Sequence, residues 1–178
     1  MKLNLINIST SRLRLCAFKP SDDSAIQNLA GDIKVYQTTL NLPHPYELEM
    51  ATKWISSHAI QFEKGNGVTL AIQLKPKETI VGTITLGISQ RHNKAELGFW
   101  VGVPYWNQGI CTEASNAMIN FAFDDLKLNK VTSRHLEGNH ASGRVMQKCG
   151  MVQEGILKNE ILKDEAFHDL VVYGILKN

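Results

Sequence analysis

The spacing of apolar residues changes in the middle of the chain, and this change constrains the fold more than any other sequence feature. Segments 68–74, 79–86 and 95–101 are rich in branched and aromatic residues and are separated by turn residues, as is typical of consecutive antiparallel strands. From Ala114 to Leu126, apolar residues recur every three or four positions, which predicts a helix with one buried face. A chain that changes period in this way belongs to a class that contains both strands and helices.

The other segments extend this alternation of strands and helices. The strand at 95–101 and a strand at 130–136 flank the helix at 114–126, which predicts a βαβ crossover inside a mixed sheet. The predicted order is β-α-α-β-β-β-α-β-α-β-β. Its other members with assigned bounds are strands at 12–15 and 170–176 and helices from Ser21, over 48–62 and over 142–148. The strand that precedes 170–176 in this order has no assigned bounds.

The composition favours a single globular domain. Hydrophobic residues make up 43% of the 178 residues and charged residues 20%, which is the range of ordinary folded domains. A chain of this length buries about 70% of the surface that its unfolded form exposes. Since we find no repeat, low-complexity segment or linker, we predict one domain over residues 1–178.

The charge pattern argues against several classes of partner. The 19 basic and 17 acidic residues are scattered and sum to +2, so nothing indicates a surface for nucleic acid or a polybasic membrane anchor. No stretch approaches the roughly 20 apolar residues that span a bilayer. Residues 1–15 also lack the apolar core of a signal peptide.

The cysteines and histidines argue against disulfide and metal frameworks. Cys16, Cys111 and Cys149 are widely spaced and odd in number, so they predict neither a disulfide framework nor a CxxC zinc pair. The six histidines show no HExxH spacing. We therefore expect no metal and a reducing, cytoplasmic location.

The segment 95–114 combines a strand, a turn and the start of a helix. A helix start presents unpaired N–H groups and the positive end of the helix dipole, so a turn that enters it suits an anion such as pyrophosphate. Gly109 permits close backbone approach, and the small Cys111 leaves room beside it. The alternative is a glycine that only turns the chain. The segment matches neither the P-loop nor the dinucleotide-binding pattern.

The same segment, from Ala-Glu-Leu-Gly-Phe-Trp-Val to Tyr-Trp-Asn-Gln-Gly-Ile-Cys-Thr-Glu-Ala, resembles the coenzyme A loop of GNAT acetyltransferases. It is most similar to the RimJ/RimL type, which acetylates protein N-termini. Segments 10–15, 139–150 and 169–174 agree, so the resemblance covers nearly the whole chain in order. It implies an α/β (α+β) fold with a mixed, mostly antiparallel central sheet and helices on both faces. Acetyl-coenzyme A is the implied co-substrate, without a metal.

The resemblance also implies which residues bind the coenzyme. Trp106 stands where the superfamily loop often has Gln or Arg, so backbone groups rather than side chains are expected to hold the phosphates. Asn139 is implied at the pantetheine arm, although a helix N-cap is its simpler interpretation. The backbone groups implied at pantetheine are those of Phe99, Trp100 and Val101, and those implied at pyrophosphate belong to Asn107, Gln108, Gly109, Ile110, Cys111 and Thr112.

Acetyl transfer requires a neutral amine, stabilisation of the thioester oxyanion and a proton for the leaving thiolate. Glu96 is the candidate base, and a solvated or ion-paired carboxylate is the alternative. Met146 stands where many GNAT enzymes have a proton-donating tyrosine. By resemblance to the RimL type, Ser142 is the candidate acid, and a serine bonded to nearby backbone is the alternative.

The sequence leaves the acceptor open. A protein N-terminal amine is the first hypothesis, a polyamine, antibiotic or other small amine the second, and a non-catalytic coenzyme A-binding module the third. By resemblance, Tyr36, His44 and Tyr46 lie near the acceptor groove, whereas Trp54 is expected in the core. A monomer or a homodimer is equally compatible with the sequence.

Overall fold

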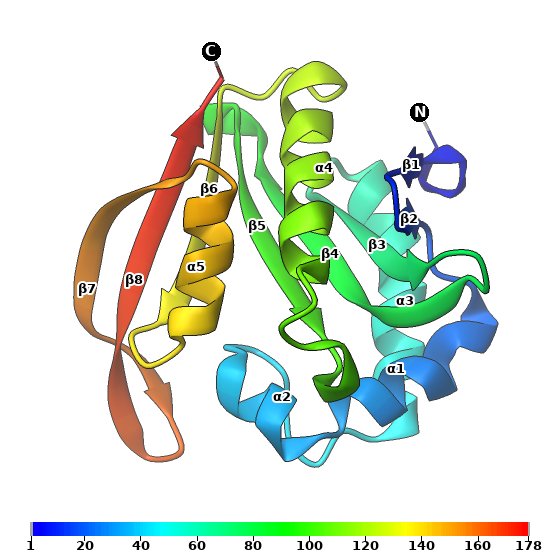
Figure 1. The fold of residues 1–178 in the computed structure, drawn as a ribbon, viewed down its shortest axis with the longest axis horizontal. Helices are drawn as coiled ribbons and strands as arrows, with labels where there is room; N and C mark the ends of the chain where they lie inside the picture. Colours follow the sequence, from blue (N-terminus) through cyan, green and yellow to red (C-terminus); the bar gives the residue numbers. More distant parts are fainter. Residues whose placement is uncertain (1, 178) are drawn as a thin grey trace.

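One eight-stranded sheet runs through the protein in a computed structural model that describes residues 2–177 (Figure 1). The strand order is β1-β2-β3-β4-β5-β6-β8-β7. The β5–β6 pair is parallel and every other pair is antiparallel. The strands are β1 (Asn7–Ser9), β2 (Leu13–Cys16), β3 (Gly67–Leu74), β4 (Thr79–Ser89), β5 (Lys94–Val101), β6 (Lys130–Leu136), β7 (Val152–Lys163) and β8 (Ala166–Leu176).

Helices cover both faces of the sheet (Figure 1). One face carries α4 and α5 side by side, and α1 and α3 lie behind the other face, while α2 sits below the sheet near the β7–β8 turn. The helices are α1 (Asp23–Ala30), α2 (Ile33–Thr38), α3 (Leu48–Glu63), α4 (Ile110–Asp124) and α5 (His140–Lys148). Among residues 2–177, no helix has the length and apolar character needed to cross a membrane.

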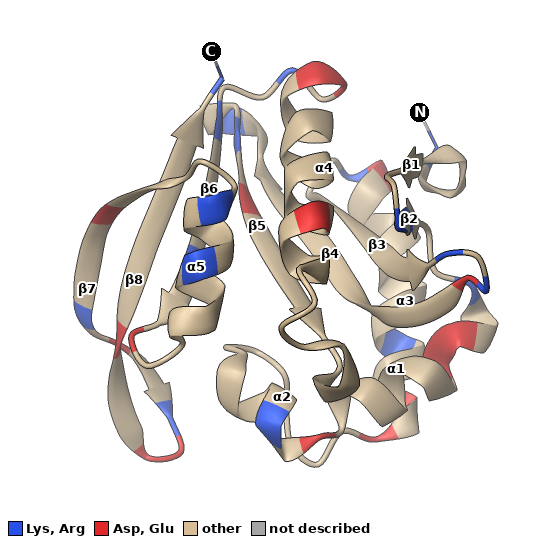
Figure 2. Ribbon diagram, in the orientation of Figure 1, with Lys and Arg blue, Asp and Glu red and all other residues tan. Residues whose placement is uncertain are grey.

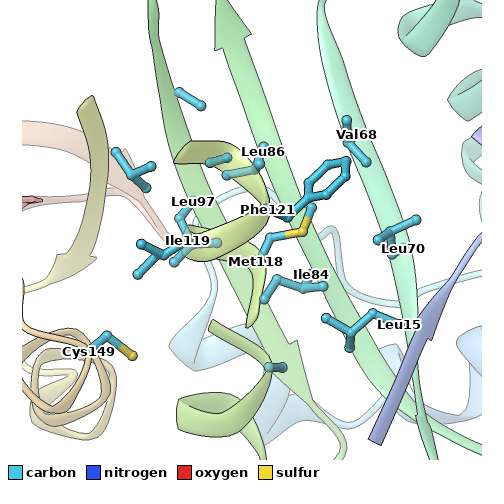
Figure 3. Packing of buried hydrophobic residues seen from close by; sticks show 14 of the residues in the cluster. Leu15, Val68, Leu70, Ile84, Leu86, Leu97, Met118, Ile119, Phe121 and Cys149 are labelled. Atoms are coloured by element: carbon cyan, nitrogen blue, oxygen red, sulfur yellow. The ribbon is translucent and has the colours of Figure 1, made fainter. Parts of the chain in front are cut away.

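Two hydrophobic clusters form the core, one on each face. Met118 and Phe121 of α4 lie over the buried side chains of the central strands, which Figure 3 shows for Ile84, Leu86 and Leu97. A smaller cluster lies under α1 and α3, where Trp100 of β5 packs against it. Because strand side chains alternate between faces, β5 contributes to both clusters.

The crossover β5–α4–β6 brings the turn before α4 to the centre of the sheet. β5 pairs with β6 only through Lys94–Glu96 and Lys130–Thr132. Beyond this point the two strands separate, and the hydroxyl of Ser133 donates to the carbonyl of Leu97 at 2.8 Å where they diverge. The β6-facing edge of β5 after Leu97 therefore has no strand beside it.

The predicted fold class and βαβ crossover are confirmed. The predicted strand at 130–136 is β6, and the other strands and helices predicted with bounds differ from the observed ones by a few residues. The strand predicted without bounds before residue 170 is β7. The helix predicted from Ala114 begins at Ile110 as α4, because its first turn belongs partly to the preceding loop and does not show the apolar period. The short α2 and β1 were not predicted, since six and three residues are too few to show a period.

Candidate active site

A cavity of about 260 Å³ opens where β5 and β6 separate. The end of β5, the turn before α4 and one side of α5 form its walls. Every residue predicted to bind the coenzyme lines this cavity, so residues from three separate parts of the fold meet at one place. The lining residues are Thr38, Thr39, Phe99, Trp100, Val101, Tyr105, Trp106, Asn107, Gln108, Gly109, Ile110, Cys111, Thr112, Asn139, Ala141, Ser142, Arg144, Val145 and Lys148.

The turn before α4 presents a row of free backbone donors to the cavity. Within residues 2–177, none of the N–H groups from Asn107 to Thr112 donates to a protein acceptor. Gly109 is the N-cap of α4 and has a φ of +75°, in the left-handed region that favours glycine. No side chain caps this helix start. Such a row of free donors at a helix start can bind an anion.

Two side chains of the turn before α4 stabilise it by donating hydrogen bonds to backbone carbonyls that precede them. The indole Nε1 of Trp106 donates to the carbonyl of Val101 at 2.8 Å. The Gln108 side chain donates to the carbonyl of Pro104 at 2.9 Å. Trp106 thus stabilises the backbone of the turn in a position where the superfamily often places a polar side chain.

The start of α5 lies across the cavity and is capped. The Asn139 Oδ1 accepts the N–H of Ser142 at 3.1 Å, and the Asn139 Nδ2 donates to the carbonyl of Thr38 at 2.9 Å. The N-cap interpretation of Asn139 is confirmed, and the same residue lines the cavity. The Ser142 hydroxyl makes no hydrogen bond within residues 2–177, so it is free to face a ligand.

Two basic residues of α5 that sequence reasoning missed also line the cavity. Arg144 and Lys148 are exposed and four residues apart, on the side of the helix that carries Val145. Figure 2 shows basic positions on α5 and an acidic position near the start of α4, whose first turn contains Glu113. The spacing of Arg144 and Lys148 in the sequence could have predicted this, since residues four apart share a helix face. Two cations on one face of the helix at 142–148 would then have indicated a basic surface.

Glu113 lies in the first turn of α4 but does not occupy the open anion site. Its carboxylate accepts hydrogen bonds from Thr10, Ser11 and Arg12. Burial opposes its ionisation, but these hydrogen bonds outweigh burial and lower the pKa of Glu113 to about 2. The carboxylate is therefore ionised and neutralised from the side of β2.

Glu96, the predicted base, lies outside the cavity lining. The Nε of Arg134 donates to its carboxylate at 2.8 Å, and the Glu96 side chain is partly exposed. Since Ala95 and Leu97 are buried on the α4 side, Glu96 points to the same face as Trp100. The observed ion pair matches one of the two interpretations of Glu96, and its role as a base stays a prediction.

The cysteines near the cavity are protonated thiols. Burial raises the pKa of Cys111 to about 12 and that of Cys149 to about 11. A thiol with such a pKa is a poor nucleophile at neutral pH. Neither thiol therefore has the chemical character of a catalytic nucleophile. Among residues 2–177, no group of three or more His, Cys, Asp or Glu side chains could hold a metal ion.

The end of α2 and the residue after it contribute to the cavity lining. Thr38 and Thr39 line it, and both escaped prediction because α2 is too short to show a pattern. Lys163, at the end of β7, donates to the carbonyl of Thr39 at 2.6 Å and lies over the ring of Tyr36, 4.1 Å from its centroid. The β7–β8 hairpin thus holds α2 against the cavity.

Comparisons with known proteins agree on one family. Residues 12–152 match the model of the acetyltransferase (GNAT) domain. The N-acetyltransferase YoaA of Bacillus subtilis is 25% identical over 171 residues, 96% of each chain. The ribosomal-protein-serine acetyltransferase of Escherichia coli is 25% identical over 140 residues, 78% of this chain and 77% of the relative. RimL, a ribosomal L7/L12 alpha-N-protein acetyltransferase solved with coenzyme A, has a TM-score of 0.88 at 18% identity, covering 96% of this chain and 98% of RimL.

Proposed function

Because this chain belongs to the GNAT family of N-acetyltransferases, we propose that it transfers the acetyl group of acetyl-coenzyme A to a protein N-terminal α-amino group. One observation carries the choice of co-substrate: the row of unpaired N–H groups from Asn107 to Thr112 that faces the cavity. Pyrophosphate is a dianion that such a row binds at a helix start. Arg144 and Lys148 add positive charge to the same cavity.

The free edge of β5 suits the pantetheine arm. Phe99, Trp100 and Val101 line the cavity at the point where β6 no longer pairs with β5. An amide-containing arm in this gap would be held by strand-like hydrogen bonds, as an added strand is. This placement would direct the thioester toward the gap between the strands and away from the phosphates.

The proposed reaction is direct attack of a neutral amine on the thioester carbon. As the amine nitrogen bonds to this carbon, Glu96 takes its proton, directly or through water. A backbone N–H near Phe99 or Trp100 stabilises the oxyanion. The carbon–sulfur bond then breaks, and Ser142 supplies a proton to the sulfur. Ser142 lines the cavity with a free hydroxyl, which supports this role.

An α-amino acceptor is favoured by its acidity and by the family relatives. An α-amino group has a pKa of about 7.7–8.0, so a substantial fraction is already neutral near pH 7.5, whereas a lysine amine has a pKa of about 10.4. A partly exposed carboxylate such as Glu96 suffices for the first group better than for the second. The Escherichia coli relative named above is a ribosomal-protein-serine acetyltransferase, which agrees with this class of acceptor.

The test is to incubate the purified chain with labelled acetyl-coenzyme A and a panel of acceptors. The panel contains peptides with free N-termini, the same peptides with blocked N-termini, polyamines and aminoglycosides. We expect label on the free peptides, with the acetyl group mapped to the α-nitrogen by mass spectrometry. If only a small amine is labelled, the proposed acceptor is wrong, but acetyl transfer to an amine is retained. Binding without any transfer would identify a coenzyme A-binding module.

A further inference from the structure

A cluster of hydrogen bonds behind the phosphate turn joins the start of β2 to the first turn of α4. The Glu113 Oε1 accepts from the Thr10 hydroxyl at 2.6 Å, from the Ser11 hydroxyl at 3.0 Å and from the N–H of Arg12 at 2.9 Å. The Arg12 Nε donates to the Glu113 Oε2 at 2.6 Å. The cluster joins segments that lie about a hundred residues apart in sequence. The proposed reaction uses none of these side chains.

The guanidinium of Arg12 binds two elements at once. While its Nε is bound to Glu113, its Nη1 donates to the backbone carbonyl of Gln108 at 3.0 Å. Its Nη2 lies beside the turn, because a Cβ built on Gly109 would be 3.5 Å from it. A lysine could not form this arrangement, since its ammonium is a single point at the end of a flexible chain.

The contact with the Gln108 carbonyl determines where the next N–H group points. The carbonyl of Gln108 and the N–H of Gly109 belong to one peptide unit, and in a trans peptide these two groups point in opposite directions. Arg12 does not line the cavity, whereas Gln108 and Gly109 do. A carbonyl turned outward to Arg12 therefore turns the Gly109 N–H inward. The charged donor also polarises the peptide and strengthens its N–H as a donor.

We propose that Arg12 is a positioning residue for acetyl-coenzyme A: held by Glu113, it fixes the Gln108–Gly109 peptide so that the Gly109 N–H faces the pyrophosphate. This role rests on the proposed function, because it assumes that the cavity binds the coenzyme. Arg12 acts through the peptide and makes no contact with the ligand itself. It affects affinity and not the chemical step.

The experiment measures binding of coenzyme A and dephospho-coenzyme A to the wild type and to Arg12→Lys by calorimetry. Dephospho-coenzyme A keeps the pyrophosphate and lacks the 3′-phosphate. We expect Arg12→Lys to bind both ligands about ten-fold more weakly, the loss of one well-oriented hydrogen bond. Turnover at saturating acetyl-coenzyme A should be unchanged, so that KM rises and kcat does not.

Arg14→Lys is the matched control. Arg14 lies on β2, two residues after Arg12, and also binds two partners through its guanidinium, with its Nε on Asn7 and its Nη1 on Glu78. Neither partner belongs to the phosphate turn. Arg14→Lys should therefore bind both ligands as the wild type does.

Glu113→Gln is a second variant that keeps the size of the side chain. Its single amide oxygen cannot accept from the Nε of Arg12 and from the donors of residues 10–12 together, so Arg12 loses its support. Glu113→Gln should therefore lower the affinity for both ligands by about as much as Arg12→Lys does. If Arg12→Lys does not fold, Glu113→Gln carries the test.

Three outcomes would overturn the role of Arg12. Wild-type affinity in folded Arg12→Lys, even with a lower melting temperature, would show that the cluster only joins β2 to α4. A loss confined to coenzyme A would show that Arg12 contacts the 3′-phosphate directly. A wild-type chain that binds neither ligand would refute the proposed function and this role with it, whereas wild-type binding with unaffected variants refutes only the role.

Discussion

The starts of α4 and α5 face the same cavity but differ in how their N–H groups are used. α4 begins at Gly109 with no side-chain cap and with free N–H groups from Asn107 to Thr112. α5 begins at Asn139, whose Oδ1 accepts the N–H of Ser142. An uncapped start leaves donors for an external anion. A capped start instead offers the side chains of its first turns, here the free hydroxyl of Ser142.

The first prediction breaks the open start of α4. Gly109→Glu adds a carboxylate where the pyrophosphate is expected, at a residue whose φ of +75° already disfavours any side chain. Repulsion and bulk should together weaken acetyl-coenzyme A binding at least about 100-fold, or about 2.7 kcal/mol. Calorimetry measures this loss, and circular dichroism checks that the fold remains.

Gly138→Glu is the control for that variant at the start of α5. Gly138 precedes the N-cap Asn139, and a Cβ there meets no heavy atom within 4 Å. It does not line the cavity, so coenzyme binding should stay near the wild-type value. If the two variants lose affinity equally, the difference between the two helix starts has no bearing on where the anion binds.

A second prediction concerns the base, which neither helix start supplies. Glu96→Gln keeps the shape of the side chain and removes its basicity, so turnover at neutral pH should fall by about 10²–10⁴-fold. Activity should recover as the pH rises, because more of the acceptor amine is then neutral. Arg134→Gln is the control, since it breaks the ion pair but leaves the carboxylate in place. Equal losses in both variants would assign Glu96 a structural role.

Ser142→Ala tests the capped start as a source of the proton. The N–H of Ser142 and its bond to Asn139 remain, so only the hydroxyl is lost. We expect turnover to fall by about 10²-fold, the lower end of general-acid effects, because water can replace the hydroxyl. The Kd for acetyl-coenzyme A should change little. A lower melting temperature with normal turnover would instead indicate a serine that serves only the helix.

The sequence predicted the structure of the turn before α4 well because the elements that form it are adjacent in the chain. A strand, a glycine turn and a helix start follow one another within 95–114, so a turn with free N–H groups can be expected from this segment alone. The helix itself begins four residues before its apolar period, since Ile110 to Glu113 serve the turn as much as the core.

The contacts between distant segments could not be predicted in the same way. The bonds from Thr10 and Arg12 to Glu113 depend on β2 lying beside α4, which only the assembled sheet determines. Thr38 and Thr39 are held at the cavity by distant residues, because Asn139 donates to the carbonyl of Thr38 and Lys163 donates to that of Thr39. Glu96 is a further example. Its residue type alone suggests a base, whereas its ion pair with Arg134 is visible only in the fold.

The acidic residue at the start of α4 gives a prediction about pH. Hydrogen bonds lower the pKa of Glu113 to about 2, against an ordinary value of 4.5, although burial opposes this. A lowered carboxylate pKa adds stability above the unfolded-state pKa, and this stability is lost as the pH falls from 4.5 toward 2. Glu113→Gln should cost about 2 kcal/mol at pH 7 and flatten this dependence. Urea titrations across this range measure both effects. A wild-type slope in the variant would contradict the assignment.

The smallest effect is expected from a substitution that removes the Asn139 cap, the feature that distinguishes the start of α5 from that of α4. Asn139→Ala deletes the acceptor for the Ser142 N–H and should lower the free energy of unfolding by about 1 kcal/mol. Asn139→Asp keeps a capping oxygen but loses the amide that donates to the Thr38 carbonyl, so it separates the two contacts. If the cap dominates, Asp restores most of the stability lost in Ala. If Asp is as unstable as Ala, the bond to Thr38 is what stabilises this region, and α5 differs from α4 through its attachment to α2 rather than through its cap.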